Sequence, residues 1–530
     1  EEAPPSPGRP PSPGRPPSSG RRPILVTTRE DEVNQQALEA LAASEPNLYE
    51  RAGTLVQVVT VDGDRPGGRA YGQAVAKPVT EARLRELLAA ACDFRAVRVT
   101  ARGVEERPAH PPIWAVRAVH GRGTWPGLPL LAGVVECPVL RRDGSVLQAP
   151  GYDRKSGLYY APAAGAGSMA AVPSSPTAAE IDAAKALLRE AVCDFPFQRE
   201  VHYAGWLSSL LTPLARFAFD GPSPLNLIDA NVRGAGKSLL ADAVTKILAG
   251  REAARMPYTR DEDEFRKSIT SLALEGSQTV LIDNVRGAFG SASLECVLTT
   301  SIWRDRLLGM NVKVTLPLQI TWFVTGNNIA LLGDIPRRCV HIRLESPEER
   351  PETREGFRHP RLLRWIGEER RHLLPAALTL LRGFVGAGRP DQGLPAWGSF
   401  EEWSDLVRGA VVWLGYPDPA ETCAELEETS AFSAERAFVL AFADVFAERG
   451  VTAREILERA ADPPAGCQDL RAAVEDLFPR LKPGELPTPV RLGYKLRSLR
   501  GRFFDGAAIQ QGSKQQGGMT WRVERSGGDS

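Results

Sequence analysis

One eight-residue segment constrains the fold of this chain more than any other: Asn231-Val232-Arg233-Gly234-Ala235-Gly236-Lys237-Ser238. It lies between the apolar run 225–228 and the helix-like run 239–248. A strand, a glycine-rich turn and a helix in this order form a phosphate-binding loop. Backbone N–H groups surround the β-phosphate, the lysine reaches the β- and γ-oxygens, and the hydroxyl holds Mg²⁺. The alternative is a glycine-rich strand-to-helix turn that contains Gly-Lys-Ser by chance and binds no nucleotide.

We therefore expect ATP and Mg²⁺ to bind here. The residues expected to contact the nucleotide are Asn231, Arg233, Gly234, Ala235, Gly236, Lys237, Ser238 and Leu239. Asn231 replaces the first glycine of the usual G-x-x-x-x-G-K-[ST] pattern. Asparagine adopts positive φ more readily than most residues, which makes it a tolerable substitute for glycine.

A second strand-like run, 278–282, ends in Asp283 and Asn284. Asp283 is placed to hold Mg²⁺ together with Ser238, as a Walker B aspartate does. Asn284 stands where many such ATPases carry the glutamate that activates water. Glu275 or an acid of the cluster 261–264 is an alternative base, although a run of acids is usually a solvated face.

Polar residues follow two further strand-like runs. Asn327 and Asn328 end the run 320–325, where a polar amide can contact the γ-phosphate and orient water; a plain polar turn is the alternative. Arg337 and Arg338 precede the run 340–344. An arginine at a subunit boundary can stabilise the transferred phosphoryl charge in a neighbouring site, whereas a surface basic pair is the alternative.

Composition limits the class of protein. The 530 residues carry 65 Lys plus Arg against 65 Asp plus Glu, so any nucleic-acid surface must be local. No apolar run approaches the roughly 20 residues of a membrane helix. The seven cysteines and six histidines show no zinc or disulfide spacing, which favours a reducing cytoplasm. The start is rich in Pro, Gly and Arg, so we expect the chain to begin within a linker after an upstream domain.

The pattern divides the chain into five parts. We expect a linker at 1–22, an α+β domain of unknown role at 23–170, and an α/β nucleotide-binding core with a parallel sheet at 178–345. A helical region follows at 346–430 and a winged-helix-like domain at 431–530. Asp143-Gly144 predicts a hairpin turn, Thr452 a capping box, and Thr488-Pro489 a helix start.

The C-terminal part is locally basic. Residues 490–525 contain eight Lys or Arg and two acids, a balance of 8 − 2 = +6. In the helix-like run 488–502, Leu492, Leu496 and Leu499 share one face. Basic side chains lie on a neighbouring face, and the expected DNA contacts are Arg491, Lys495 and Arg502. A solvated basic helix is the alternative.

The ordered set of loop, Asp283-Asn284, Thr325-Gly326-Asn327-Asn328 and Arg337-Arg338 resembles superfamily 3 helicases of the AAA+ class. It is similar above all to the ATPase part of phage and mobile-element primase-helicases, which are related to the poxvirus primase-helicase. The stretches 303–309 and 398–403 share the likeness, which covers residues 178–430 best.

The resemblance implies a hexameric ring with nucleotide between subunits and single-stranded DNA in the pore. It also implies a DNA-gripping hairpin at 309–314, with Lys313 as the contact. We expect an ATP-driven helicase that acts on forked DNA in replication, with a primase domain upstream or as a partner. A nucleotide-switched DNA-binding or loader protein with weak hydrolysis is the alternative, and a small-molecule kinase fits poorly.

Overall fold

The computed structural model describes residues 21–525 apart from short gaps. The gaps are 45–46, 62–72, 101–102, 163–168, 260, 286–287, 307–312, 328, 349, 463–467, 479–480, 482–483 and 516–517. Most of the predicted linker, together with Asn328 and residues 309–312 of the predicted DNA hairpin, therefore falls outside the described residues.

Residues 21–61 and 74–133 form one compact unit, and residues 134–525 form a second. The first unit holds two three-stranded sheets, in the orders β1-β5-β6 and β2-β3-β4. Its elements are β1 (Arg22–Val26), α1 (Glu30–Ser44), β2 (Leu48–Arg51), β3 (Thr54–Val61), β4 (Gln73–Pro78), α2 (Glu81–Ala91), β5 (Cys92–Thr100), β6 (Gly103–Pro108) and α3 (Ile113–His120). The helices pack their leucine and valine faces together in one core.

The second unit begins with short strands. They are β7 (Gly133–Val135), β8 (Val139–Leu140), β9 (Val146–Leu147), β10 (Gly151–Asp153) and β11 (Leu158–Tyr160). Strands β8 and β9 pair antiparallel with Val139 opposite Leu147, and Gly144 in their turn takes a φ of 79°. The predicted Asp-Gly hairpin is thus confirmed.

A five-stranded sheet forms the centre of the second unit, in the order β13-β14-β18-β12-β20. All of its neighbouring strands run parallel, which confirms the predicted mixed α/β region with a parallel sheet. The strands are β12 (Leu225–Ala230), β13 (Arg255–Met256), β14 (Thr279–Val285), β18 (Thr321–Gly326) and β20 (Cys339–Leu344). The helices around it are α4 (Ala178–Glu190), α5 (Glu200–Ala215), α6 (Lys237–Ala249), α7 (Glu262–Glu275) and α8 (Ala292–Val297).

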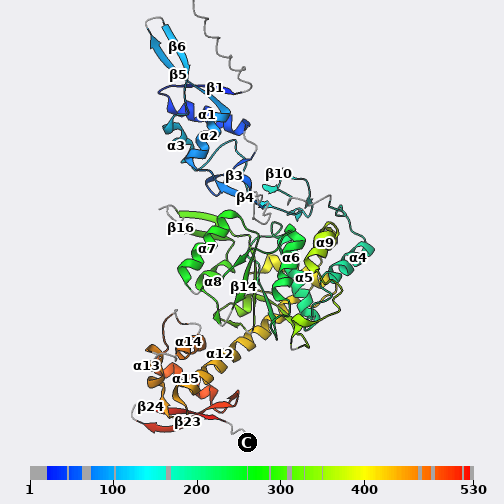
Figure 1. The fold of residues 1–530 in the computed structure, drawn as a ribbon, viewed down its shortest axis with the longest axis vertical. Helices are drawn as coiled ribbons and strands as arrows, with labels where there is room; N and C mark the ends of the chain where they lie inside the picture. Colours follow the sequence, from blue (N-terminus) through cyan, green and yellow to red (C-terminus); the bar gives the residue numbers. More distant parts are fainter. Residues whose placement is uncertain are drawn as a thin grey trace, which may run out of the picture. The chain divides into compact units, whose positions relative to one another are not determined.

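Helices cover both faces of this sheet, with α5 and α6 on one side and α7 and α8 on the other (Figure 1). All six residues of β12 are buried. Double coverage explains why the central strands appear in the sequence as continuous apolar runs rather than as alternating patterns. Since parallel strands end at a common edge, the polar residues that follow β12, β14 and β18 meet there.

Smaller elements surround the sheet. They are β15 (Ala288–Phe289), β16 (Ile302–Arg306), β17 (Lys313–Pro317), β19 (Ala330–Leu331) and the 3₁₀ turns η1 (Pro336–Arg338) and η2 (Pro351–Thr353). A helical region follows, with α9 (Leu362–Gly386), α10 (Glu401–Trp403), the π-helical η3 (Ser404–Arg408), α11 (Gly409–Trp413), η4 (Pro419–Glu421) and α12 (Thr422–Phe446).

The C-terminal part packs helices against a four-stranded sheet of order β21-β24-β23-β22. Its elements are β21 (Val451–Thr452), α13 (Ala453–Ala461), α14 (Gln468–Leu477), α15 (Pro489–Leu499), β22 (Phe503–Phe504), β23 (Ala507–Gln515) and β24 (Gly518–Arg525). Thr452 and Glu455 form the predicted capping box of α13. Thr488 caps α15 with Pro489 in its first turn, also as predicted.

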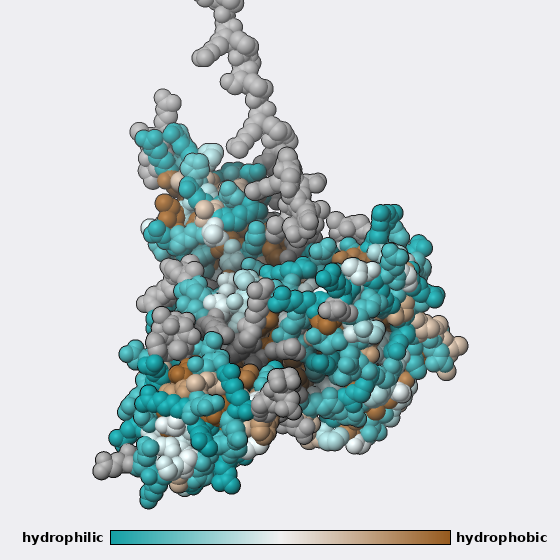
Figure 2. All heavy atoms as spheres, turned by 60° about the horizontal axis from the view of Figure 1, so that its bottom comes forward, coloured by the Kyte–Doolittle hydropathy of each residue, from teal (hydrophilic) through white to brown (hydrophobic). Residues whose placement is uncertain are grey.

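The surface drawn in Figure 2 is mostly hydrophilic among the described residues, and hydrophobic side chains gather there only in small separate patches. Within the described part of the chain, no helix combines the length and the apolar character that a membrane crossing requires.

A buried histidine makes the stability of the second unit depend on pH. His202 of α5 is fully buried, with Nδ1 3.0 Å from the carbonyl oxygen of His341 and Nε2 3.1 Å from Gln198 Oε1. Burial lowers its pKa from 6.5 to about 4. Between those two pH values the unfolded chain therefore binds more protons than the folded chain. The contribution of His202 to the free energy of unfolding is fully present above about pH 6.5. It is lost as pH falls towards about 4, at a total cost of about 3 kcal/mol.

We expect His202→Gln to flatten this part of the pH dependence. Urea unfolding followed by tryptophan fluorescence at several pH values measures it. The matched control is His372→Gln, at a partly exposed histidine beside Glu369. An equally steep loss of stability in His202→Gln would contradict the assignment.

Candidate nucleotide-binding site

The glycine-rich loop connects the end of β12 to the start of α6. Gly234 and Gly236 take φ values of 79° and 87°. A Cβ on Gly234 would lie 2.5 Å from Glu352 Oε2, and one on Gly236 would lie 3.0 Å from Phe195 Cε1. The left-handed backbone conformation therefore favours glycine at both positions, and the Phe195 ring adds crowding at Gly236, whereas the Glu352 side chain beside Gly234 can shift.

Asn231 fixes the start of the loop. Its Nδ2 donates to the carbonyl oxygen of Ser346 at 2.9 Å, and its Oδ1 accepts from the Ser346 backbone N–H at 3.0 Å. The backbone of Asn231 does not take a positive φ. The Asn231 side chain thus connects the loop to the segment after β20. The expectation that asparagine stands here because it tolerates positive φ is wrong.

Lys237 opens α6 and points to the end of β18. Its Nζ donates to Asn327 Oδ1 at 2.6 Å. Burial lowers the pKa of Lys237, although the charges of Asp229 and Asp283 oppose that shift. The structure therefore brings together a lysine and an amide that the sequence places 90 residues apart.

Ser238 and Asp283 are also in contact. Ser238 Oγ donates to Asp283 Oδ1 at 2.6 Å, and Thr325 Oγ1 donates to the same oxygen at 2.5 Å. Burial alone would raise the pKa of Asp283, but hydrogen bonds from Ser238, Thr325 and Arg255 together lower it below its ordinary value. Asp283 is therefore an anion near neutral pH.

Two participants in this cluster were missed by sequence reasoning. Arg255 of the edge strand β13 donates through Nε to Asp283 Oδ2 at 2.9 Å and through Nη2 to Asp242 Oδ2 at 2.7 Å. For Thr325, the sequence predicts only a place at the end of a strand. Its place opposite Asp283 follows from parallel strands that end together, but a two-residue strand such as β13 leaves no sequence signal that would reveal Arg255.

Asn284 occupies an unusual backbone position. Its φ is 57°, and the pairing of β14 with β18 shifts between Ile282 and Val285, so that Asp283 and Asn284 form a bulge. The backbone N–H of Asn284 donates to Thr325 Oγ1 at 2.9 Å. Asparagine tolerates this left-handed conformation better than glutamate does, which gives a structural reason for its presence.

The acids of the cluster 261–264, which were expected as alternative bases, have structural partners. Asp261 caps α7 by accepting from the backbone N–H groups of Asp263 and Glu264. Glu262 accepts from the Ser293 N–H at 2.7 Å, and Glu264 pairs with Lys267. Glu275 is the last residue of α7.

The two predicted arginine-finger residues lie in η1, before β20. Arg337 pairs with Asp334, and its carbonyl oxygen accepts from Trp397 Nε1 at 2.9 Å. Arg338 is mostly buried and donates to Asp334 and to Ser399 Oγ, each at 3.4 Å. More than half of the Arg337 side chain is exposed, so this guanidinium is the one that a second molecule could reach.

A partly open pocket adjoins the loop. Apolar side chains dominate its wall, namely Phe195, Leu239, Pro351, Phe357 and Leu362. Asp194, Glu352, Arg354 and His359 add polar groups, and Gly234, Ala235 and Gly236 of the loop complete the wall. A largely apolar pocket with a few polar groups is typical of small-molecule sites.

No protein-family model matches this chain, and no curated protein matches it. Among solved structures, the C-terminal region of NrS-1 is similar over 93% of this chain and 98% of its own, with 10% identity and a TM-score of 0.34. The structure of JCV helicase is similar over 49% of this chain and 71% of its own, with 13% identity and a TM-score of 0.20.

The predicted DNA contacts, Arg491 and Lys495 of α15 and Arg502 in the turn after it, differ in their surroundings. Lys495 Nζ and Arg502 Nη1 bind the two carboxylate oxygens of Glu435, at 2.9 and 2.6 Å. Glu435 lies buried in α12, so Lys495 holds α15 against α12 and Arg502 holds the turn that follows α15. Arg491 is exposed instead, and so is Arg497, whose guanidinium lies 5.4 Å from the Tyr494 ring.

Lys313 begins β17 and lies opposite Arg306 at the described end of the β16–β17 hairpin. Its side chain is exposed. A cation in this position is open to a polyanion.

Proposed function

We propose that the chain is an ATP-dependent DNA helicase of superfamily 3 type, which hydrolyses ATP to move on and unwind DNA. One observation carries the proposal: Lys237, Ser238, Asp283 and Asn327 meet at the shared carboxyl edge of three parallel strands. A lysine, a hydroxyl, a carboxylate and an amide are the groups that phosphoryl transfer to water requires.

The donor set of this cluster fits Mg²⁺. Ser238 and Asp283 offer a hydroxyl and an ionised carboxylate, the hard oxygen ligands that Mg²⁺ prefers. When bound, the ion would neutralise phosphate charge. Arg255 now satisfies Asp283 Oδ2 through Nε and buried Asp242 through Nη2, so the ion would replace only the bond from Nε.

The chain's own residues supply the remaining steps. Backbone N–H groups of the loop and Lys237 hold the phosphates, and Asn327 orients the attacking water. The apolar pocket formed by Phe195, Leu239 and Phe357 takes the nucleoside base. Lys237 Nζ lies 2.6 Å from Asn327 Oδ1. A γ-phosphate bound between these two side chains would replace this hydrogen bond with one contact to each of them.

DNA and a second subunit complete the proposal. Lys313 would grip single-stranded DNA in the pore of a homo-hexamer, and Arg337 would reach the nucleotide of the neighbouring subunit. The C-terminal part would act as a winged-helix-like DNA-binding domain, with a primase upstream or as a partner. A particle-size measurement with an ATP analogue and single-stranded DNA tests the assembly, and a hexamer is the expected result.

The test of the function combines two assays on the full chain: DNA-stimulated ATP hydrolysis and strand separation on a forked substrate. Activity in both is expected. Failure in both would remove the helicase proposal.

A second candidate is a nucleotide-switched DNA-binding or loader protein. The observation that favours it is Asn284, which stands where many ATPases with a phosphate-binding loop carry a water-activating glutamate. Single-turnover hydrolysis with and without single-stranded DNA separates the two proposals. Strong stimulation supports the motor, whereas tight ATP binding with slow, unstimulated hydrolysis supports the switch.

The pairing of Lys495 leads to a prediction about DNA binding. Arg491→Ala should weaken binding to forked DNA several-fold and lower the salt slope of the binding constant by about 1, because one phosphate contact is lost. Lys495→Ala should instead destabilise the C-terminal part by about 1 kcal/mol, because buried Glu435 loses one of its two partners. Fluorescence anisotropy over a salt series, with thermal unfolding, distinguishes the outcomes. An unchanged salt slope in Arg491→Ala would contradict the assignment.

A further inference from the structure

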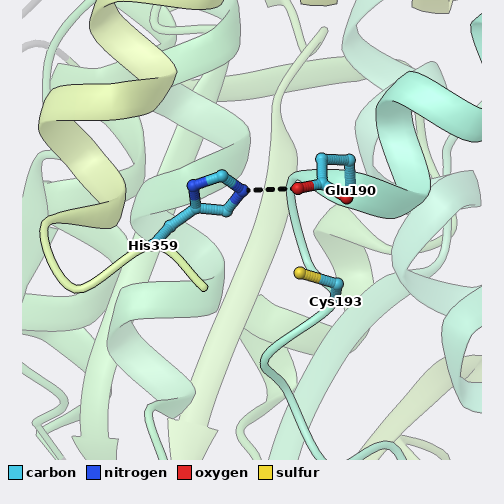
Figure 3. A group of neighbouring side chains, drawn as sticks. All are labelled: Glu190, Cys193 and His359. Carbon is cyan, nitrogen blue, oxygen red and sulfur yellow. Dashed lines mark hydrogen bonds and ion pairs between the residues drawn. The ribbon is translucent and has the colours of Figure 1, made fainter. Parts of the chain in front are cut away.

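Three potential metal ligands meet beside the nucleotide pocket, away from the phosphate cluster. They are Glu190 at the end of α4, Cys193 in the turn that follows, and His359 shortly before α9. Figure 3 shows the Glu190 carboxylate and the His359 ring facing each other, with the Cys193 sulfur beside them. One ligand atom from each residue lies within 4.8 Å of the others, and His359 Nε2 is 2.9 Å from Glu190 Oε1.

Neighbouring groups hold this cluster in place. Both carboxylate oxygens of Asp194 accept backbone N–H groups, from Arg358 and from His359, each at 3.0 Å. The His359 ring stacks on Trp365 at a centroid distance of 4.0 Å and an angle of 24°. The turn after α4 and the segment before α9 are thereby fixed to each other, and the imidazole is oriented before any ligand arrives.

The mixture of ligands selects a class of metal. A thiolate, an imidazole and a carboxylate together suit Zn²⁺, whereas Mg²⁺ and Ca²⁺ prefer oxygen alone. Ligand bonds of about 2.0–2.3 Å would bring the three atoms to about 3.5 Å from one another. Glu190 Oε1 and His359 Nε2, now 2.9 Å apart, would separate slightly, and the exposed Cys193 side chain would supply the remaining adjustment.

Arg358 is the group that opposes a cation. Its Nε lies 2.5 Å from Glu190 Oε1, but 69% of the side chain is exposed and it can turn into solvent. Because a cysteine binds metal as the thiolate, Zn²⁺ binding at Cys193 would release the thiol proton.

We propose that Glu190, Cys193 and His359 form a binding site for one Zn²⁺-class ion, with a fourth position for water. Asp194 and His359 also line the pocket beside the loop, and Phe195 lies against Gly236. The ion would hold two walls of that pocket at a fixed separation. The link to nucleotide rests on the proposed function, but the metal site itself does not.

Cobalt titration of the full chain tests the site, because a cobalt–thiolate bond gives a charge-transfer band in the near ultraviolet. One equivalent of Co²⁺, displaced by Zn²⁺, is expected. Cys193→Ser should abolish the band, and His359→Gln should weaken affinity by at least about tenfold, since even an outer-shell partner is worth that much. The matched controls are Cys296→Ser and His372→Gln, at a cysteine and a histidine outside the cluster.

A measurement on the unaltered chain avoids variants that fail to fold. Zn²⁺ should protect Cys193 from maleimide labelling, read by peptide mass spectrometry, while exposed Cys296 stays reactive. Equal labelling of Cys193 with and without Zn²⁺, or a cobalt band that survives Cys193→Ser, would overturn the proposal. Neither readout depends on ATP, so failure here is distinct from failure of the proposed function.

Discussion

Lys237→Ala is expected to lower DNA-stimulated ATP hydrolysis by about 10²–10³-fold, the cost of removing one preorganised group that stabilises transferred phosphoryl charge. Lys237 is half-buried at the start of α6 and donates to Asn327 Oδ1 at 2.6 Å. Alanine would remove the cation from the phosphates and leave the Asn327 amide without this partner. Nucleotide affinity should fall together with the rate, because the lysine contacts bound ATP before and during the reaction.

The measurement is steady-state hydrolysis at saturating single-stranded DNA, with a fluorescent ATP analogue for affinity. Lys267→Ala is the matched control, since Lys267 is a partly exposed lysine of α7 that pairs with Glu264. Its rate should equal that of the unaltered chain. If Lys237→Ala retains full hydrolysis, the loop does not bind phosphate in the way proposed.

The sequence predicts the centre of this site well, for a physical reason. Parallel strands that are buried on both faces appear as apolar runs, and whatever follows them meets at one edge. The runs that end before Asn231, Asp283 and Asn327 could therefore be placed together without coordinates. The lysine and serine follow from the loop motif itself.

Groups that reach the site from outside these runs could not be predicted. Arg255 belongs to a two-residue strand, and only its register beside Leu281 brings it to Asp283. The helical spacing of α15 likewise places Lys495 on a basic face, but buried Glu435 of α12 binds it. In both cases the decisive partner is distant in the sequence, and local periodicity carries no information about it.

The two asparagines that replace motif residues differ in cause. Asn231 departs from glycine because its amide bridges to Ser346 through two hydrogen bonds. Asn284 departs from glutamate at a bulge where φ is 57°. A tertiary contact therefore explains Asn231, and a backbone conformation explains Asn284. Neither cause can be predicted from the sequence.

Asp283→Asn should separate binding from hydrolysis. Asparagine keeps one oxygen for Ser238 and Thr325, but it removes the charge and turns an amide towards the Nε–H of Arg255. Loop N–H groups and Lys237 still hold the phosphates, so nucleotide affinity should change little. Hydrolysis should fall by about 10²–10³-fold, because the carboxylate that holds Mg²⁺ is gone.

Asp305→Asn is the matched control for this change. Asp305 also accepts from a threonine, Thr270 Oγ1 at 2.7 Å, and from an arginine, Arg266 Nη1 at 3.0 Å, but outside the loop cluster. Equal losses in both variants would point to a general effect on the fold. Loss in Asp283→Asn alone, with ATP still bound, would assign the metal-holding role to Asp283, because only there does the carboxylate face Ser238 and the phosphate loop.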